Sequence, residues 1–205
     1  MAKDIASRLA AQKGGENLSV FSLDTGEGKE KGIDGRYTQK KADIAICRDG
    51  RPIAGVAVKF VMSNYKQNSN NYFENMLGET ANIRCADILY FQLLAMLDKL
   101  PYFNRDGRIT KWERITESNL KKYLALSRDN PGLYRHTPDK TLVFVVRICE
   151  GENPTLTSKS EYIKHYLGTS FTFGLSELQF CGGQALIYND YESFADKVTY
   201  AVLSV

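Results

Sequence analysis

The chain has 205 residues, of which 43% are hydrophobic and 25% are charged, and its formal net charge is +3. This composition is typical of one compact globular domain, and so small a net charge does not by itself indicate a nucleic-acid partner. The four cysteines form no Cys-x-x-Cys pair, which argues against a zinc ribbon or a disulfide scaffold, and the lack of a long apolar run predicts no membrane span.

Strands and helices alternate along the chain. In chain order, we expect a helix at 4–12, a strand at 17–23, a β-hairpin at 40–60, a helix from about 71 to 100, a helix at 116–129, a strand at 140–148, a helix at 160–167, a strand at 183–188 and a helix at 191–203. The polar stretches 24–41 and 62–71 are expected to be a mobile connection and a loop. Interleaved strands and helices predict an α/β fold with a mixed central β-sheet flanked by helices.

The expected hairpin carries one charge in each of its apolar strands. Asp43 lies near the start of the first strand and Lys59 near the end of the second. If the turn is centred on Gly50, Asp43 lies opposite Ala57, and Lys59 points to the same face two residues further on. The two charged residues are then roughly 7–8 Å apart at the backbone, within reach of one small substrate group. On spacing alone, a salt bridge on a solvated edge strand is the competing interpretation.

An Asp that leads one strand, a Lys that ends the next and a helix directly afterwards resemble the core of the restriction endonuclease-like superfamily, the PD-(D/E)XK nucleases. The stretch KADIAI occupies the place of the family's PD strand, and GVAVKF resembles its (D/E)XK strand. The likeness covers residues 40–100 and the strand at 140–148. It implies a mixed sheet flanked by helices, with residues 1–205 as a single nuclease domain.

The resemblance also implies a chemistry. Hydrolysis of a phosphodiester requires neutralisation of charge on the phosphate and a source of hydroxide. Carboxylates bind Mg²⁺, the metal lowers the pKa of its bound water, and a nearby lysine orients or deprotonates that water. Asp43 is then expected to be the metal ligand, and Lys59 the cation beside the water.

The sequence departs from the family pattern at position 57, where alanine stands in place of the second carboxylate. Three explanations stay open, in order of preference: the carboxylate has migrated, Ala57 is an introduced Glu→Ala change, or the protein is a non-catalytic relative. Some family members recruit a glutamate from the following helix. Glu74 lies at a similar offset here and is preferred, with Glu79 close behind. A solvated helix face is the competing interpretation of either glutamate.

An Asn-rich segment beside the hairpin is a candidate surface for DNA. It contains Lys66, Gln67, Asn70 and Asn71. Asn and Gln can pair with the edge of adenine, and Lys contacts phosphate. A solvated loop is the alternative, because Asn favours turns.

Residues 104–140 are expected to form a basic helical insertion. From Arg105 to Lys140 there are nine basic and five acidic residues, and nine minus five leaves +4, more than the +3 of the whole chain. Such asymmetry suits a nucleic-acid footprint. We therefore expect Arg105, Arg108 and Lys111 to contact DNA, with an ordinary solvated insertion as the alternative.

Together these features predict a Mg²⁺-dependent endonuclease acting on double-stranded DNA, most simply a type II restriction enzyme. Asn- and Arg-rich surfaces would let one small chain both recognise and cut its substrate. Cleavage of both strands favours a homodimer, and the unpaired cysteines fit a reducing cytoplasm. The resemblance to restriction enzymes implies that this is the cytoplasm of a bacterium or archaeon. The alternatives are a DNA repair or junction-resolving nuclease of the same fold, or a DNA-binding module with a vestigial site.

Overall fold

The computed structural model describes residues 1–25, 28–149, 155–168, 170–180 and 186–205. Its helices are α1 (Ala2–Ala10), α2 (Tyr65–Arg84), α3 (Glu117–Arg128), α4 (Lys159–Gly168) and α5 (Tyr191–Leu203). The strands of its main sheet are β1 (Leu18–Phe21), β4 (Ile44–Arg48), β5 (Arg51–Val61), β6 (Leu89–Leu97), β9 (Lys140–Cys149), β10 (Thr172–Leu175) and β11 (Ile187–Tyr188).

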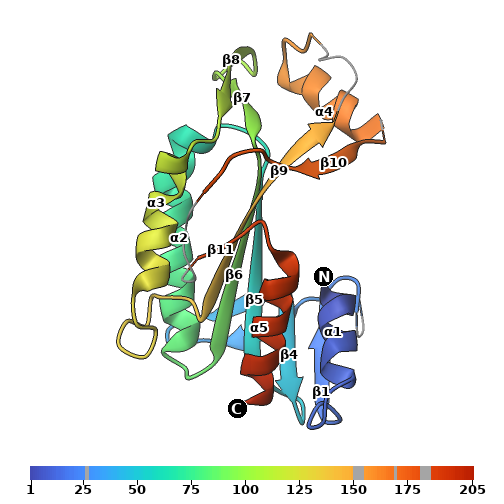
Figure 1. The fold of residues 1–205 in the computed structure, drawn as a ribbon, viewed down its shortest axis with the longest axis vertical. Helices are drawn as coiled ribbons and strands as arrows, with labels where there is room; N and C mark the ends of the chain where they lie inside the picture. The colour runs from blue at the N-terminus through green and yellow to red at the C-terminus, as the bar shows by residue number, and fades with distance from the viewer. Residues whose placement is uncertain (26–27, 150–154, 169, 181–185) are drawn as a thin grey trace.

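Within the described residues, the seven strands form one mixed sheet in the order β1-β4-β5-β6-β9-β10, with β11 beside β9 (Figure 1). β5, β6 and β9 run parallel to one another, and β1, β4 and β10 pair antiparallel with their neighbours. The class predicted from the sequence, α/β with a mixed central sheet flanked by helices, is confirmed.

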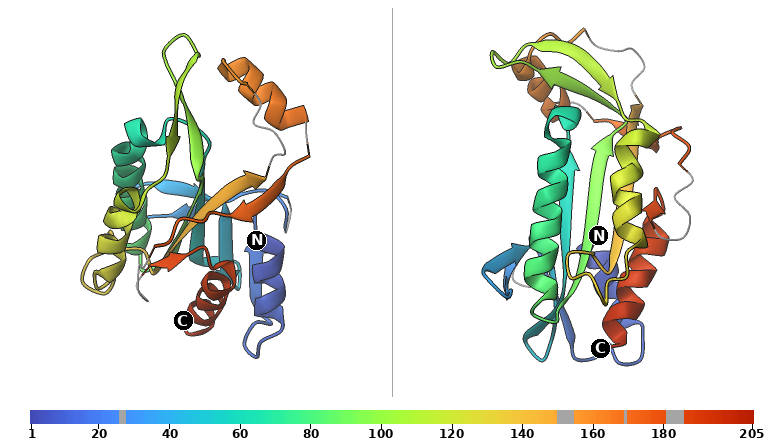
Figure 2. Two further views of the ribbon diagram at one scale, coloured as in Figure 1. Left: turned by 45° about the horizontal axis from the view of Figure 1, so that its top comes forward. Right: turned by 90° about the vertical axis from the view of Figure 1, so that its left-hand side faces the viewer.

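Helices cover both faces of the sheet (Figure 2). α1 and α5 pack on one face, where Phe194 joins the apolar side chains of β4, β5 and β6. α2 and α3 pack on the other face through Tyr65 and Leu120. Successive strand residues alternate between the two cores, so Leu93 lies in the first and Leu94 in the second. In the described part of the chain, no helix is long and apolar enough to cross a membrane.

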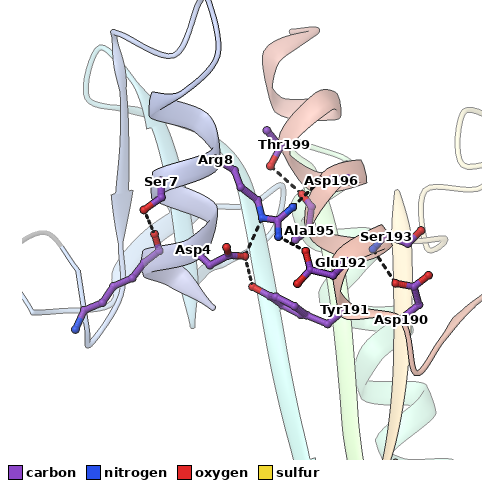
Figure 3. Close-up of polar contacts among 11 residues, drawn as sticks. Asp4, Ser7, Arg8, Asp190, Tyr191, Glu192, Ser193, Ala195, Asp196 and Thr199 are labelled. Carbon is purple, nitrogen blue, oxygen red and sulfur yellow. Dashed lines mark hydrogen bonds and ion pairs between the residues drawn. The ribbon is translucent and has the colours of Figure 1, made fainter.

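One arginine joins the first helix to the last (Figure 3). Arg8 lies 2.9 Å from Asp4 in its own helix. On α5 it pairs with Asp196 at 2.6 Å and also with Glu192. The Tyr191 hydroxyl donates to Asp4 at 2.7 Å. Burial disfavours the Asp4 charge, but the hydrogen bonds from Tyr191 and Arg8 outweigh it and lower the pKa of the Asp4 carboxyl.

β4 and β5 form the antiparallel hairpin predicted for residues 40–60. Its turn residues Asp49 and Gly50 have φ angles of 48° and 79°. A two-residue hairpin turn of type I′ needs positive φ at both central residues, and an Asp-Gly sequence supplies it at little strain. The register shifts by one residue beside Ile46, so β5 carries one more residue than β4 over the same length.

The helix predicted from about 71 to 100 is wrong in its second half. α2 ends at Arg84, Asp87 takes a φ of 58°, and the chain continues as β6. β6 is buried on both faces because helices cover both sides of the sheet, and such an apolar run has no period that separates strand from helix. The loop predicted at 62–71 is also mostly helix, because α2 begins at the buried Tyr65.

Two small hairpins stand outside the main sheet. β2 (Lys31–Asp34) pairs with β3 (Gln39–Ala42), so part of the connection predicted at 24–41 is ordered strand. β7 (Lys99–Phe103) pairs with β8 (Ile109–Arg114) and rises beyond the end of β6 (Figures 1 and 2). Residues 104–140, predicted as a helical insertion, are therefore strand in β8 and helix only in α3.

Candidate functional site

A pocket of about 310 Å³ lies between the start of β4, the middle of β5, the hairpin β2–β3 and α2. We call it the Asp43 pocket. Its wall contains Asp43, Lys59 and Glu79, which were predicted as catalytic residues, together with Ala57. β3 adds Lys40. The fold thus brings to one place side chains that lie on separate strands and on a helix.

Asp43 is fixed against the backbone of β5. Ile44 pairs with Val56, and continuing this register by one residue places Asp43 beside Ala57. The Asp43 Oδ2 atom accepts a hydrogen bond from the Val58 N–H at 2.7 Å. An ionised carboxylate has two acceptor oxygens, so Oδ1 can still bind a cation. The strand therefore sets the position of the carboxylate without using up its capacity for a ligand.

Lys59 lies on the same face of β5 as Ala57, two residues further along the strand. Its Nζ atom is 5.2 Å from the centre of the Tyr72 ring on α2. This is a cation–π distance. Because Tyr72 lines the Asp43 pocket as well, the ring holds the ammonium group beside that pocket.

The two candidate glutamates of α2 lie in different surroundings. Glu79 lines the Asp43 pocket and pairs with Lys40 at 2.6 Å. Glu74 does not line the pocket and lies within electrostatic reach of Lys122 on α3. Burial lowers the pKa of Lys122, and Glu74 partly offsets that effect. Five helical positions rotate a side chain by about 140°, so the two glutamates cannot share a face. The geometry favours Glu79 as the second carboxylate, whereas the sequence offset favours Glu74.

β6 supplies a hydroxyl to the pocket that the sequence analysis did not identify. Tyr90 is fully buried, and its hydroxyl has no hydrogen-bond partner among the described residues. Burial, with the neighbouring charges of Glu79 and Asp43, raises the pKa of Tyr90. A buried donor without a partner is rare in native proteins. Because Tyr90 lines the Asp43 pocket, a water or a polar ligand in that pocket would give its hydroxyl a hydrogen-bond partner.

Gln92 is the second group from β6 that the sequence analysis missed. It pairs with Ala57 in the β5–β6 register and lines the Asp43 pocket with only 4% of its surface exposed. Its amide donates to Thr80 on α2 at 3.4 Å. A glutamine inside an apolar run was the available signal in the sequence. The helical interpretation of 71–100 hides that signal, because it does not place position 92 beside position 57.

The oxygen donors of the Asp43 pocket fit a Mg²⁺ ion. This hard cation is usually held in proteins by one or two carboxylates together with waters and a substrate phosphate. Asp43 and Glu79 provide two carboxylates, and the Gln92 carbonyl is a further oxygen donor. Within the described residues, no three His, Cys, Asp or Glu side chains lie close enough to hold a metal by themselves. A metal here would therefore depend on water and phosphate for the rest of its ligands.

The predicted DNA-binding residues of α2 lie along its first half. Lys66, Gln67, Asn70 and Asn71 are all exposed on the helix surface. Asn70 accepts a hydrogen bond from Lys122 on α3 at 3.2 Å, so it is also part of the contact between α2 and α3. None of the four lines the Asp43 pocket, so they form an exposed polar surface on the first half of α2.

A second cleft, also of about 310 Å³, runs from α2 to the tip of the β7–β8 hairpin. We call it the Arg105 cleft. Tyr72 lines both this cleft and the Asp43 pocket, so the two adjoin. Arg105 and Lys159 supply positive charge, and none of the described residues that line the cleft is acidic. Arg108 and Lys111, the other candidates, are exposed on the hairpin outside the cleft.

Comparisons of the chain with protein-family models, curated proteins and solved structures find no match. The interpretation of the Asp43 pocket therefore depends on its own geometry and chemistry.

Proposed function

We propose that the protein is a Mg²⁺-dependent endonuclease of the restriction endonuclease-like fold that hydrolyses double-stranded DNA. The observation that carries the proposal is the convergence of Asp43, Lys59 and Glu79 on one pocket. They come from a β-hairpin and the helix that follows it, which is the order of elements that the PD-(D/E)XK resemblance implies. The adjoining cleft, with Arg105 and Lys159 and no acidic lining residue among those described, supports a polyanionic substrate.

Each residue of the Asp43 pocket has a distinct role in this proposal. Asp43 and Glu79 would hold the metal through carboxylate oxygens, and Lys40 balances the charge of Glu79. When bound, Mg²⁺ polarises the phosphate and lowers the pKa of its water. Lys59 orients the attacking water and offsets the charge that develops on the phosphate. The neutral Tyr90 hydroxyl is available to donate a hydrogen bond to a water or ligand oxygen in the same space.

The specific activity that we propose is that of a type II restriction enzyme working as a homodimer. The amides of Gln67 and Asn71 are exposed on α2 beside the Arg105 cleft. Such amides can read adenine in the major groove, while basic residues contact phosphates. A two-fold axis would place one Asp43 pocket on each strand of the duplex.

Ala57 is the observation that favours a second candidate, a DNA-binding protein without cleavage. It lies in the wall of the pocket beside Asp43, where a glutamate would add a third carboxylate. If the pocket needs that carboxylate, the protein binds DNA and leaves it intact.

Nicking of supercoiled plasmid in Mg²⁺, in Mn²⁺ and in EDTA separates the candidates. We expect the unmodified protein to cut in either metal and to be inactive in EDTA. Cleavage by Ala57→Glu alone would show that the alanine disables an otherwise intact site. Duplex binding without cleavage by either protein would leave only the binding module. Ends mapped at base resolution would identify a recognition sequence, and preference for a four-way junction would assign a junction-resolving nuclease instead.

A further inference from the structure

A further pocket, of about 500 Å³, shares no residue with the Asp43 pocket or the Arg105 cleft. It lies where the ends of β6 and β9 meet the β7–β8 hairpin, α4 and the segment after β10. Figure 1 shows these elements together at one end of the sheet. A cavity of this size is within the range of sites for small molecules and cofactors. The proposed endonuclease mechanism makes no use of it.

Charges of both signs line this pocket, and among the described residues the one ion pair between lining residues joins Arg147 to Glu177. Asp98, at the end of β6, is half-buried, and Arg114 and Arg147 attract it electrostatically. Burial nevertheless raises the pKa of Asp98. Within the described residues, no ion pair of 4.0 Å or less joins Asp98 to either arginine, and Arg147 pairs with Glu177 instead. The pocket therefore offers separate sites for a negatively charged group and for a hydrogen-bond donor.

Two aromatic rings complete the wall. Trp112 of β8 is half-buried, with the Lys99 ammonium 5.3 Å from its ring centre, and Tyr166 comes from α4. Trp112 is the only tryptophan of the chain. Aromatic side chains of this kind are the surfaces on which nucleobases stack.

We propose that this pocket binds one nucleotide. Arg114 receives the phosphate, with Arg147 beside it in its ion pair with Glu177. Asp98 accepts a hydrogen bond from an amino or ring N–H of the base, and the base stacks on Trp112 or Tyr166. A simple anion would not engage the Asp98 carboxylate or the Trp112 ring, and an apolar ring compound would not engage Arg114. The nucleotide is either free in solution or part of a DNA strand, and only the second source depends on the proposed function.

The fluorescence of Trp112 reports directly on the pocket. The experiment uses the full-length Asp43→Asn protein in EDTA, so that no cleavage is needed or possible. Deoxyadenosine and deoxycytidine monophosphates are titrated as probes, with deoxyribose 5-phosphate and inorganic phosphate as probes that lack a base. We expect saturable quenching by at least one mononucleotide and at least tenfold weaker binding of the probes without a base.

Two variants test the assignment of the phosphate site. Arg114→Gln should raise the Kd for the mononucleotide about tenfold, the usual effect of losing one charge-assisted hydrogen bond. Arg128→Gln is the matched control, because this exposed arginine lies at the end of α3, outside the pocket. If Arg114→Gln does not fold, as judged by circular dichroism, Arg147→Gln makes the same test.

A duplex oligonucleotide, with its binding followed by anisotropy, distinguishes the two sources. Quenching by mononucleotides but not by bound duplex identifies a free nucleotide. Quenching by bound duplex that Arg114→Gln removes, but Arg128→Gln does not, identifies a nucleotide of the DNA strand. Absence of quenching by every mononucleotide and by bound duplex would overturn the inference, as would equal quenching by phosphate alone. None of these results depends on whether the wild-type protein cuts plasmid DNA.

Discussion

Replacement of Glu79 by glutamine should separate catalysis from folding at the Asp43 pocket. The change keeps the size of the side chain and removes its charge, so the pair with Lys40 is lost. The Lys40 and Glu79 side chains are 39% and 34% exposed, and a pair this accessible to water contributes at most about 1 kcal/mol to folding. A typical domain has about 5–15 kcal/mol of stability, so Glu79→Gln should remain folded.

The cleavage rate should respond much more strongly than the stability. Loss of one group that stabilises the transition state typically lowers the rate by about 10²–10³-fold, or about 2.7–4 kcal/mol of barrier. Single-turnover nicking of supercoiled plasmid measures the rate, and urea unfolding measures the stability. Glu74→Gln is the matched control, with the same chemistry on the same helix, and should stay within about twofold of wild type. Equal losses in the two variants, or a larger loss in Glu74→Gln, would refute the choice of Glu79.

Three further predictions concern other parts of the molecule. Replacing Arg105 and Lys159 together by glutamine should make the affinity for duplex DNA less dependent on salt. The slope of log affinity against log salt concentration, measured by anisotropy, should fall by about one unit per lost phosphate contact. An unchanged slope would place the Arg105 cleft away from the DNA. The lowered pKa of Asp4 stabilises the fold above about pH 4, and this contribution is lost as the pH falls through the folded pKa. Tyr191→Phe, which removes one hydrogen bond to Asp4, should therefore lower the unfolding temperature more at pH 7 than at pH 3. Phe194→Ala, at a fully buried position, should lower the free energy of unfolding by about 3–5 kcal/mol in urea titrations.

The hairpin shows how far local sequence determines structure here. The Asp-Gly sequence specifies the turn, and the turn sets the register in which Asp43 lies opposite Ala57. Because side chains alternate along a strand, Lys59 lies on the same face as Ala57. A turn centred on Gly50 predicts that Asp43 lies opposite Ala57, and the observed register also places them side by side. The observed turn is centred between Asp49 and Gly50, and the one extra residue of β5 beside Ile46 makes up the difference. Short-range geometry was therefore sufficient to bring Asp43 and Lys59 to one face.

The rest of the site depends on packing that no local pattern reveals. Glu74 and Glu79 have similar surroundings in the sequence, and only the rotation of α2 against β5 and α3 separates them. Tyr90 and Gln92 reach the pocket because β6 pairs with β5, and the partners Gly55–Tyr90 and Ala57–Gln92 are each 35 residues apart in the chain. An apolar run buried on both faces has the same pattern as a buried helix, so the sequence analysis placed these two residues in the wrong element.

The central claim is that the Asp43 pocket is a metal-dependent centre for phosphodiester hydrolysis. The most direct measurement is single-turnover nicking of supercoiled plasmid in Mg²⁺ by wild type and by Asp43→Asn, at protein concentrations that saturate the DNA. Asparagine retains the acceptor for the Val58 N–H but lacks the charge that a cation needs. We expect a loss of about 10²–10³-fold in rate, with duplex affinity and unfolding midpoint unchanged. Equal cleavage rates for the two proteins would contradict the claim.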